Sequence, residues 1–287
     1  MRFHRIILAL ICAVILSAFF LMPEQPILAE ESDYRALFIN VGKADAILLM
    51  LGEERYLVDT GTKDTYDHLE KVLGLYGVSK LDAVFITHTD KDHVGGLKKL
   101  VKSDIQVDMV YAAELHNEES HQKHEAFKTA RKKNIPFTWL KAGDVLDKGD
   151  YSFEVLGPLK VDWNSENNNS LVMNLKTPHG NILLTGDMEF DEERQLLQAG
   201  LIPQATVLKV AHHGDNDSTS DAFIKAVSPQ WAIISTSSAE EPDTPDNGIM
   251  TALWNIKAGV AVTEDAEVGI LVSLLDGNAT AQQIDLN

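Results

Sequence analysis

Four potential metal ligands lie within six residues of one short segment, ITHTDKDHVGG, between Ile86 and Gly96. Imidazoles and carboxylates are both common ligands of divalent cations, and the segment contains two of each: His88, Asp90, Asp92 and His93. Two carboxylates about 4 Å apart repel each other by roughly 4 kcal/mol at an effective dielectric constant of about 20, and a divalent cation would convert this repulsion into attraction. A solvated turn would have a similar composition, because Thr, Asp and Gly are ordinary loop residues. This segment alone therefore fits a metal site and a polar turn about equally well.

The spacing within this segment suggests how its side chains would share two ions. His88 and Asp90 are two positions apart, so both side chains could face one ion. Asp92 and His93 follow, and they could face a second ion about 3.5–4 Å from the first, as is usual in two-metal sites. The two glycines that come next allow the backbone to approach closely and begin the next helix. The segment is therefore expected to supply about half of a metal centre.

Two further strand ends offer ligands of the same kind. The segment LLTGDM places Asp187 after an apolar strand, and LKVAHHGD places His212 and His213 after another. Each motif is weak by itself, because Gly-Asp is common in turns and paired histidines can cap a strand. Three strand ends that all present His or Asp predict one divalent metal centre better than three unrelated loops. The sequence leaves open which of the two histidines is the ligand.

The segments that must position these side chains follow the pattern of a layered α/β protein. The mostly apolar segment LDAVFITH is typical of a strand that is buried on both faces. It leads directly into the segment from His88 to Gly96, which is called the metal loop below. Strands come first and two runs of mixed helix and strand follow, which predicts two sheets packed face to face with helices outside. No Pro/Gly/Ser-rich linker or tandem repeat divides residues 33–287, so we expect one domain there.

Periodicity and turn residues predict the individual elements. Helices are expected over residues 65–77, 95–103, 120–133, 190–200, 220–227 and 248–258. Strands are expected over residues 34–41, 44–52, 55–61, 81–88, 107–112, 151–158, 170–178, 180–187, 205–214, 231–236, 268–275 and 280–286. Three histidines in or near the polar third helix are expected on its exposed face and not at a second metal site: His116, His121 and His124.

The first 29 residues differ in character from the rest of the chain. Arg2 and Arg5 precede an apolar run over residues 6–22, and Ala29 is a suitable residue for cleavage. This pattern predicts a secretory signal over residues 1–29, or an uncleaved membrane anchor, because the run is at the short limit for a membrane span. In either case the two arginines stay on the cytoplasmic side of the membrane, and the domain is expected to be secreted or extracytoplasmic.

Composition limits both the partners and the ligands. The formal net charge of −18 opposes nonspecific binding to nucleic acid or to an anionic membrane, so a phosphate-bearing substrate would need local metal charge. The single cysteine, Cys12, lies in the N-terminal apolar run. An exported domain without it has no disulfide, and any metal there must bind His, Asp, Glu or Asn.

Taken together, these motifs resemble those of the metallo-β-lactamase-fold hydrolases, and more narrowly the metallo-β-lactamase domain of the ComEC-type competence proteins. The resemblance runs in order through residues 34–275, in the segments FINVGKADAILL, YLVDTG, THTDKDHVGG, NNNSLVMNL, LLTGDM and LKVAHHGD. It implies a four-layer αβ/βα sandwich with a metal centre at the edge of its two sheets. It also implies hydrolysis of phosphodiesters in DNA or RNA.

The resemblance also implies roles for individual residues. Asp187 would bind close to both ions. His88 and Asp90 would hold the first ion. Asp92, His93 and either His212 or His213 would hold the second. Asp59 and Gly61 match a family segment whose carboxylate supports the metal loop. Asn169 and Ser170 match a segment in which many relatives have a further histidine ligand.

Departures from the family pattern affect the substrate side more than the metal loop. Asn40 and Ala44 replace an Asp and a Gly, and Asp215 replaces the Ser of a usual HHGS segment. The segment EPDTPDNGIM lacks a histidine that relatives usually carry. Few nitrogen ligands and many carboxylates suit Mn²⁺, and Zn²⁺ also fits. We therefore expect one or two divalent ions, Zn or Mn.

The expected activity is hydrolysis by a metal-activated water, with Asp90 or Asp187 orienting the water or accepting its proton. The sequence has no Ser-His-Asp or Cys-His signature, so no covalent intermediate is expected. The acidic composition favours a small phosphodiester over a nucleic-acid polymer. β-Lactams are disfavoured, because Asp90 stands where β-lactamases generally have His.

Two alternatives remain open at this point. One is hydrolysis of another ester or a lactone. The other is a non-catalytic, metal-binding extracellular domain, which the missing histidine and the HHGD variant suggest. No protein partner is predicted, and residues 6–22 could tether the domain to a membrane.

Overall fold

The computed structural model describes residues 32–114 and 118–286. Residues Asp33–Asn287 form one compact unit. The segment expected to be a secretory signal or anchor lies outside the described residues. Within the part of the chain that is described, no helix has the length and apolar character needed to cross a bilayer.

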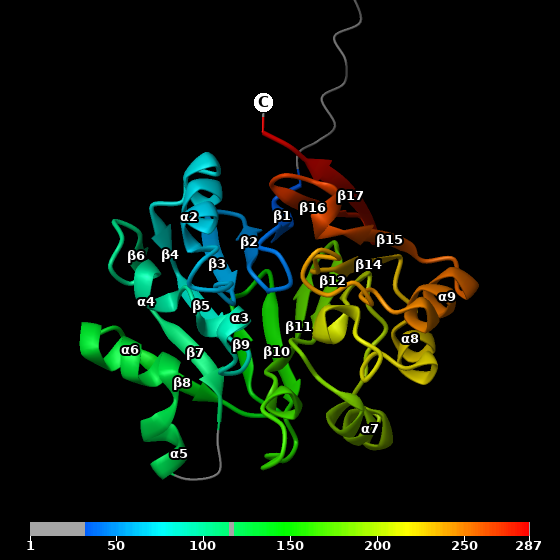
Figure 1. The fold of residues 1–287 in the computed structure, drawn as a ribbon, viewed down its shortest axis with the longest axis horizontal. Coiled ribbons are helices and arrows are strands. Elements are labelled where there is room, and N and C mark those ends of the chain that lie inside the picture. Colours follow the sequence, from blue (N-terminus) through cyan, green and yellow to red (C-terminus); the bar gives the residue numbers. More distant parts are fainter. Residues whose placement is uncertain (1–31, 115–117, 287) are drawn as a thin grey trace, which may run out of the picture. The chain divides into compact units, whose positions relative to one another are not determined.

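Eight strands form the first sheet, in the order β17-β16-β1-β2-β3-β5-β7-β8 (Figure 1). Pairing is antiparallel from β17 to β3 and parallel from β3 to β8. Its strands are β1 (Tyr34–Ile39), β2 (Ile47–Leu51), β3 (Glu54–Val58), β5 (Ala83–Ile86), β7 (Val110–Ala113), β8 (Phe137–Leu140), β16 (Gly269–Leu275) and β17 (Asn278–Ile284).

Seven strands form the second sheet, in the order β15-β14-β13-β12-β11-β10-β9. Pairing is antiparallel from β9 to β12 and parallel from β12 to β15. Its strands are β9 (Val145–Asp147), β10 (Ser152–Gly157), β11 (Val172–Thr177), β12 (Gly180–Leu184), β13 (Val207–Lys209), β14 (Trp231–Ile234) and β15 (Gly259–Val262). Two short strands, β4 (Lys80–Leu81) and β6 (Gln106–Val107), form a separate pair.

Helices cover the outer faces of the two sheets, which gives the expected αβ/βα sandwich (Figure 1). The first sheet packs against α2 (Tyr66–Leu75), α4 (Leu97–Leu100) and α6 (Glu125–Lys133). The second packs against α7 (Phe190–Ala199), α8 (Asp221–Val227) and α9 (Asn247–Asn255). The remaining helices are α3 (Lys91–Val94), α5 (Glu118–Lys123), η1 (Asn167–Asn169), η2 (Ala211–Gly214) and η3 (Thr263–Asp265).

The two-sided burial expected for LDAVFITH is what the structure has in β5. All four residues of this strand are buried. Because side chains alternate across a strand, Ala83 and Phe85 enter the core between the sheets, whereas Val84 and Ile86 pack under the helices. A strand fixed on both faces gives the metal loop that follows it a rigid starting point.

The helix expected over residues 120–133 is two helices, α5 and α6, because His124 adopts an extended backbone between them. His124 is 4% exposed, and its ring meets the ring of Trp139 edge-on. The prediction that this histidine lies on an exposed face is therefore wrong, because its ring is more favourable against an aromatic surface than in water. His121 stacks on the same indole, and His116 lies outside the described residues.

Strands β8, β9 and β15 were not predicted either.

Candidate metal centre

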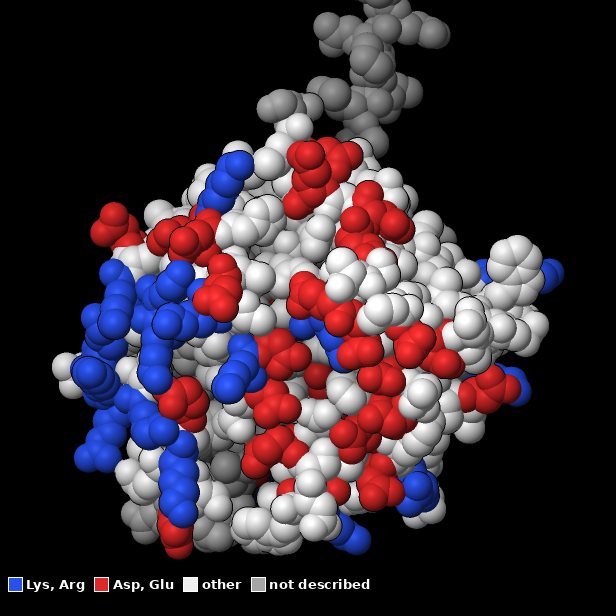
Figure 2. All heavy atoms as spheres, in the orientation of Figure 1, with Lys and Arg blue, Asp and Glu red and all other residues white. Residues whose placement is uncertain are grey.

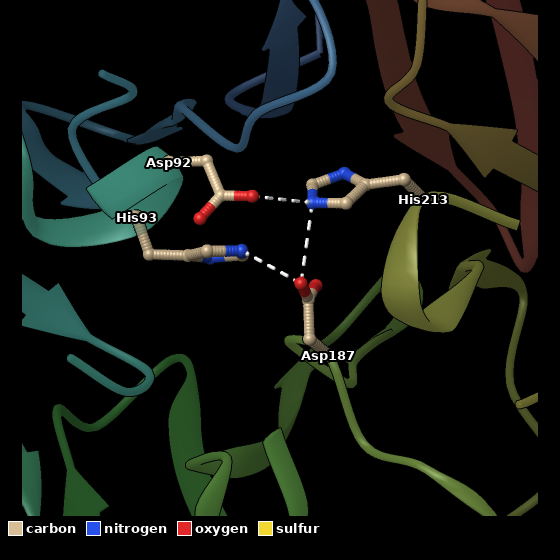
Figure 3. Close-up of side chains that lie close together, drawn as sticks. All are labelled: Asp92, His93, Asp187 and His213. Carbon is tan, nitrogen blue, oxygen red and sulfur yellow. Dashed lines mark hydrogen bonds and ion pairs between the residues drawn. The ribbon is translucent and has the colours of Figure 1, made fainter. Parts of the chain in front are cut away.

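Four of the candidate ligands converge from three segments that follow strands of both sheets (Figure 3). Asp92 and His93 lie on α3, which follows β5, while Asp187 follows β12 and His213 follows β13. The Nε2 atom of His93 lies 2.9 Å from Asp187 Oδ2, and the Nε2 atom of His213 lies 3.2 Å from the same oxygen. Asp92 Oδ2 lies 3.4 Å from His213 Nε2. These four residues are called the ligand cluster below.

His88 and Asp90 lie together beside the ligand cluster. His88 Nε2 is 3.8 Å from Asp90 Oδ2, and the rings of His88 and His93 are 4.1 Å apart. The side chain of His88 is fully buried, whereas that of Asp90 is 51% exposed. The structure thus places the expected first pair next to the expected second set, with Asp90 on the solvent side.

The backbone after α3 requires glycine where it meets the loop that follows β3. A Cβ atom on Gly96 would lie 2.2 Å from the carbonyl oxygen of Thr60, which no side chain can tolerate. This close approach is held by Thr60, whose N–H and hydroxyl both donate to the carbonyl of His93, at 2.7 and 2.8 Å. Gly96 N–H donates to Gly61 O at 3.1 Å. The glycines thus fix α3, and with it Asp92 and His93, against the core of the first sheet.

Asp59 orients the metal loop through three interactions. Its Oδ1 accepts from the backbone N–H of Thr87 at 2.8 Å, and its Oδ2 accepts from the Thr87 hydroxyl at 2.7 Å. The same Oδ2 lies 2.8 Å from Nδ1 of His93. A carboxylate on one ring nitrogen holds the other nitrogen toward the centre, as in many metal-binding histidines. This is the position that the supporting role proposed for Asp59 requires.

Gly61, Asn169 and Ser170 act at different distances from the ligand cluster. Gly61 has a left-handed φ of 62° and donates to the carbonyl of Asp45 at 2.7 Å. The Oγ atom of Ser170 accepts from the backbone N–H of Asp187 at 2.9 Å, so it fixes a residue of the cluster directly. Among the described residues, the side chain of Asn169 bonds within its own loop, to Asp162 and to the carbonyl of Ser165.

The structure distinguishes the two adjacent histidines. Both have left-handed backbone conformations, with φ of 47° for His212 and 54° for His213, so their side chains diverge. His213 enters the cluster, and its Nδ1 lies 2.8 Å from the carbonyl of Ser235. His212 turns toward Asp217, with 2.7 Å between Nδ1 and Oδ1, and its Nε2 lies 3.2 Å from the amide nitrogen of Asn167. Of the two candidates left open, only His213 lies in the ligand cluster.

Sequence reasoning missed two buried charges that support the cluster. Lys209 is 1% exposed, and its Nζ forms an ion pair with Asp45, which is also 1% exposed. The same ammonium lies 3.5 Å from Asp187 Oδ1 and donates to the carbonyl of Gly186 at 2.9 Å. A lysine within the apolar strand LKVA was a usable signal, because an unpaired lysine is almost never fully buried. It implied a carboxylate partner, although the sequence did not say which one.

Electrostatic interactions divide the cluster into protonated rings and ionised carboxylates when no cation is bound. Burial by itself lowers the pKa of His213, but Asp187 and Asp92 raise it to about 9. Burial likewise opposes the charge on His93, and Asp187 with Asp59 raises its pKa well above the usual range. Burial would raise the pKa of Asp187, yet His213, His93 and Lys209 hold it well below the usual value.

The other residues of the centre, Asp90, Asp92 and His88, have a different balance. Burial raises the pKa of Asp90, and the Asp92 carboxylate raises it further. Burial opposes ionisation of Asp92 too, but its contacts with His213 and His93 lower its pKa to about 2. Burial and the nearby His93 charge hold the pKa of His88 well below its usual value, so this ring is neutral. A neutral imidazole has the free lone pair that a metal ligand needs.

The donor set fits a divalent cation. Two ring nitrogens, His88 Nε2 and His213 Nε2, are buried without a hydrogen-bond partner among the described residues. Buried polar atoms rarely lack a hydrogen bond, and these two nitrogens lie within ion-pair distance of the carboxylates of Asp90, Asp92 and Asp187. Imidazole nitrogens and carboxylate oxygens together suit Zn²⁺ or Mn²⁺.

Sequence comparisons show which known proteins this chain resembles. A family model described as the metallo-beta-lactamase superfamily matches residues 39–237. The chain is 31% identical over 261 residues to ComE operon protein 3 of Bacillus subtilis, which covers 85% of this chain and 33% of that protein. It is 25% identical over 229 residues to recombination protein 2 of Haemophilus influenzae, which covers 78% of this chain and 27% of that protein. The chain thus spans a third or less of the length of these relatives.

Solved structures share the fold. The metallo-beta-lactamase fold protein YhfI from Bacillus subtilis superposes with a TM-score of 0.58 at 16% identity, covering 83% of this chain and 99% of that one. A diphosphatase from the PhnP family superposes with a TM-score of 0.51 at 10% identity, covering 84% of this chain and 98% of that one. These matches and the two-sheet architecture confirm the predicted fold class.

Proposed function

We propose that this chain, which belongs to the metallo-beta-lactamase superfamily of metal-dependent hydrolases, hydrolyses phosphodiester bonds. The observation that carries the proposal is the donor set, in which three carboxylates, those of Asp90, Asp92 and Asp187, lie among three imidazole rings. Alignment of most of the chain with relatives named as a recombination protein and a competence protein supports it, because recombination acts on DNA. Phosphodiesters in nucleic acid, or in a smaller molecule, are therefore the proposed substrates.

The candidate ligands would divide between one or two divalent cations, Zn²⁺ or Mn²⁺. Asp92, His93, Asp187 and His213 would form one set, and His88 with Asp90 would complete the centre. A bound divalent cation supplies a low pKa for a coordinated water and compensates negative charge that develops on phosphoryl oxygens. Asp59 and Lys209 hold these side chains in place.

The two proposed catalytic carboxylates have different surroundings. Asp187 is 2% exposed and is held by His93, His213 and Lys209, so it is fixed as a ligand. Asp90 is half-exposed at the solvent side, and its nearest ring nitrogen is 3.8 Å away. Asp90 Oδ2 is thus better placed to orient a water molecule and to accept its proton.

Export is proposed from the N-terminal sequence alone. Two arginines followed by the apolar run over residues 6–22 support either a cleaved signal or a membrane tether. Mass spectrometry of the protein recovered from a bacterial host, together with its partition between membrane and soluble fractions, distinguishes these cases. An intact chain in the cytoplasm would contradict both.

An activity assay with defined metal content tests the proposed reaction. The metal-free protein is loaded with Mn²⁺ or Zn²⁺, its metal content is measured by elemental analysis, and hydrolysis of bis-p-nitrophenyl phosphate is followed. Metal-dependent release of p-nitrophenol is the expected result. Bound metal without turnover of this ester would contradict the proposal. Activity on lactones or other esters would then favour a different hydrolase, and inactivity on every substrate would favour a metal-binding domain.

A further inference from the structure

A groove between α4 and α6 is a second feature of the face that carries the metal loop. It encloses about 230 Å³, and six of its lining residues are charged: Lys98, Lys102, Glu125, Lys128, Lys132 and Lys133. Five lysines and one glutamate give a formal balance of +4, in a chain whose total is −18. We call this feature the lysine groove.

The basic charge of the lysine groove is only partly neutralised. Glu125 is shared between two lysines, 2.6 Å from Lys98 Nζ and 3.0 Å from Lys128 Nζ. The ammonium groups of Lys102, Lys132 and Lys133 have no carboxylate within ion-pair distance in the described part of the chain. All three side chains are exposed. The groove therefore presents positive charge that a partner can use.

Figure 2 shows how sharply the charges separate on this face. Most Lys and Arg in this view gather at the left, where Figure 1 places α4 and α6, and most Asp and Glu lie in the middle and right. The net charge of the whole chain conceals this separation. A polyanion approaching this face meets attraction on one side and, until a cation is bound, repulsion at the centre.

Packing does not explain why these lysines lie together. In α6 the buried residues are Ala126, Thr129 and Ala130, and in α4 they are Leu97 and Leu100. The lysines lie on the opposite, solvent-facing sides. Basic residues in the last turn of α6 favourably oppose the helix dipole, but this does not account for Lys98 in α4 or for Lys102, two residues beyond it.

The lysine groove adjoins the metal loop along the chain. Only two glycines separate α3, which carries Asp92 and His93, from α4. Lys98 is thus five positions after His93, on an element whose placement is fixed by the Gly96–Thr60 contact described above. A strand held in the groove would lie next to the segment that carries half of the centre.

We propose that the lysine groove binds the phosphate backbone of a nucleic acid and holds the strand beside the metal centre. This inference rests on the proposed phosphodiesterase function, whose polymeric substrate it specifies. Nucleic-acid phosphates are contacted mainly by Lys and Arg side chains, which neutralise the backbone without reading its sequence. The groove accordingly predicts binding with little sequence preference.

An anionic membrane surface fits the groove less well. Membrane-binding surfaces combine basic residues with exposed apolar side chains that enter the lipid. Among the described residues, none of the large exposed apolar side chains lies on α4 or α6. The groove is also concave and lined by the stems of lysines from two helices, a shape that suits a strand better than a flat surface.

Binding of a fluorescent 20-nucleotide single strand to the full-length protein, measured by anisotropy in EDTA at several salt concentrations, tests the proposal without any cleavage. Neutralising four phosphates predicts a slope of log K against log salt of about −2.8. The variant K102Q/K132Q/K133Q is expected to reduce this slope by about 2 and to weaken binding at low salt by at least about tenfold. The control K160Q/K225Q/K257Q removes three lysines elsewhere and is expected to leave both values unchanged. Equal losses in the two variants, or no loss in either, would overturn the proposal.

Two further measurements separate this inference from the function on which it rests. With metal bound, K102Q/K132Q/K133Q is expected to hydrolyse bis-p-nitrophenyl phosphate at the normal rate while its KM for a polymer rises about tenfold. Wild-type protein that binds the strand but hydrolyses neither substrate would contradict the phosphodiesterase function and leave the groove supported. Groove-dependent binding to phosphatidylglycerol vesicles without binding to the strand would identify the partner as a membrane and overturn the nucleic-acid assignment.

Discussion

The ligand cluster and the lysine groove lie on one face but treat charge in opposite ways. In and beside the cluster the carboxylates pair with cationic groups, and Asp45, Asp187 and Lys209 are almost completely buried. In the groove three exposed ammonium groups have no acidic partner in the described part of the chain. Burial removes the water that would otherwise stabilise a charge, so buried charges must pair, whereas solvent allows like charges to gather. Substitutions in the two regions are therefore expected to have very different costs.

The largest expected effect is the loss of a ligand. His93→Ala removes the ring that lies between Asp59 and Asp187, and a loss of roughly 10⁴-fold in the metal-dependent rate is expected, comparable with the loss of a catalytic group in other hydrolases. Rates with bis-p-nitrophenyl phosphate and metal content per chain measure it. His179→Ala, in the turn between β11 and β12, is the control. An unchanged rate in His93→Ala would refute the assignment of the centre.

Removing the buried ammonium is the next largest change. Lys209→Met leaves Asp45 without its ammonium partner and removes one of the cations beside Asp187, and breaking a buried pair costs about 3–5 kcal/mol of unfolding free energy. Urea denaturation of the metal-free protein measures it. The matched control is Lys176→Met, which breaks an exposed pair with Glu154 at 3.0 Å and is expected to cost at most about 1 kcal/mol. Equal costs would show that burial does not distinguish the two pairs.

The buried ring of His124 should make stability depend on pH. Burial lowers its pKa from 6.5 to about 4, so below pH 6.5 the unfolded chain binds a proton that the folded chain excludes. The contribution of the neutral ring to the free energy of unfolding is complete above pH 6.5 and is lost as the pH falls from there through about 4. The total loss is up to about 3 kcal/mol. Urea midpoints between pH 7 and 4 measure it, with His124→Gln as the non-titrating reference. Parallel pH profiles for the two proteins would show that this ring does not contribute.

The smallest effect on stability is expected from substitutions in the lysine groove. K102Q/K132Q/K133Q removes three exposed charges that have no acidic partner, and surface substitutions of this kind usually change stability by less than about 0.5 kcal/mol. Relief of repulsion between lysines would make the change slightly stabilising. Urea denaturation at low salt measures it. A loss of stability as large as that in Lys209→Met would mean that the lysines are structural and not a binding surface.

The metal loop was the part of the site that the sequence specified best. A buried strand ending in THTDKDH predicts a cluster of ligands, because the strand's position is fixed on both faces and short spacing keeps the side chains together. The convergence of Asp187 with this loop was expected from the His and Asp residues at several strand ends, although β5 lies in the first sheet and β12 in the second. Local sequence could not separate His212 from His213, because adjacent residues share every neighbour along the chain.

Contacts between distant segments were beyond the reach of the sequence. Lys209 and Asp45 are 164 positions apart. Each could have had other partners until the two sheets packed together. His124 shows the converse failure: its polar neighbours predict a solvent-exposed helix, but the chain breaks there so that the ring can reach Trp139. The polarity of neighbouring residues predicts the exposure of a side chain only where tertiary packing does not provide a more favourable contact for it.

The sequence by itself determined the family, the two-sheet architecture and the types of ligand available, because these depend on periodicity, strand ends and short spacings. Only the tertiary structure decided that His213 enters the cluster and that Lys209 compensates its carboxylates. It also decided that an acidic chain concentrates lysines in one groove beside the metal loop. Composition adds charges without regard to position, whereas electrostatic energy depends on distance and burial, which folding alone sets.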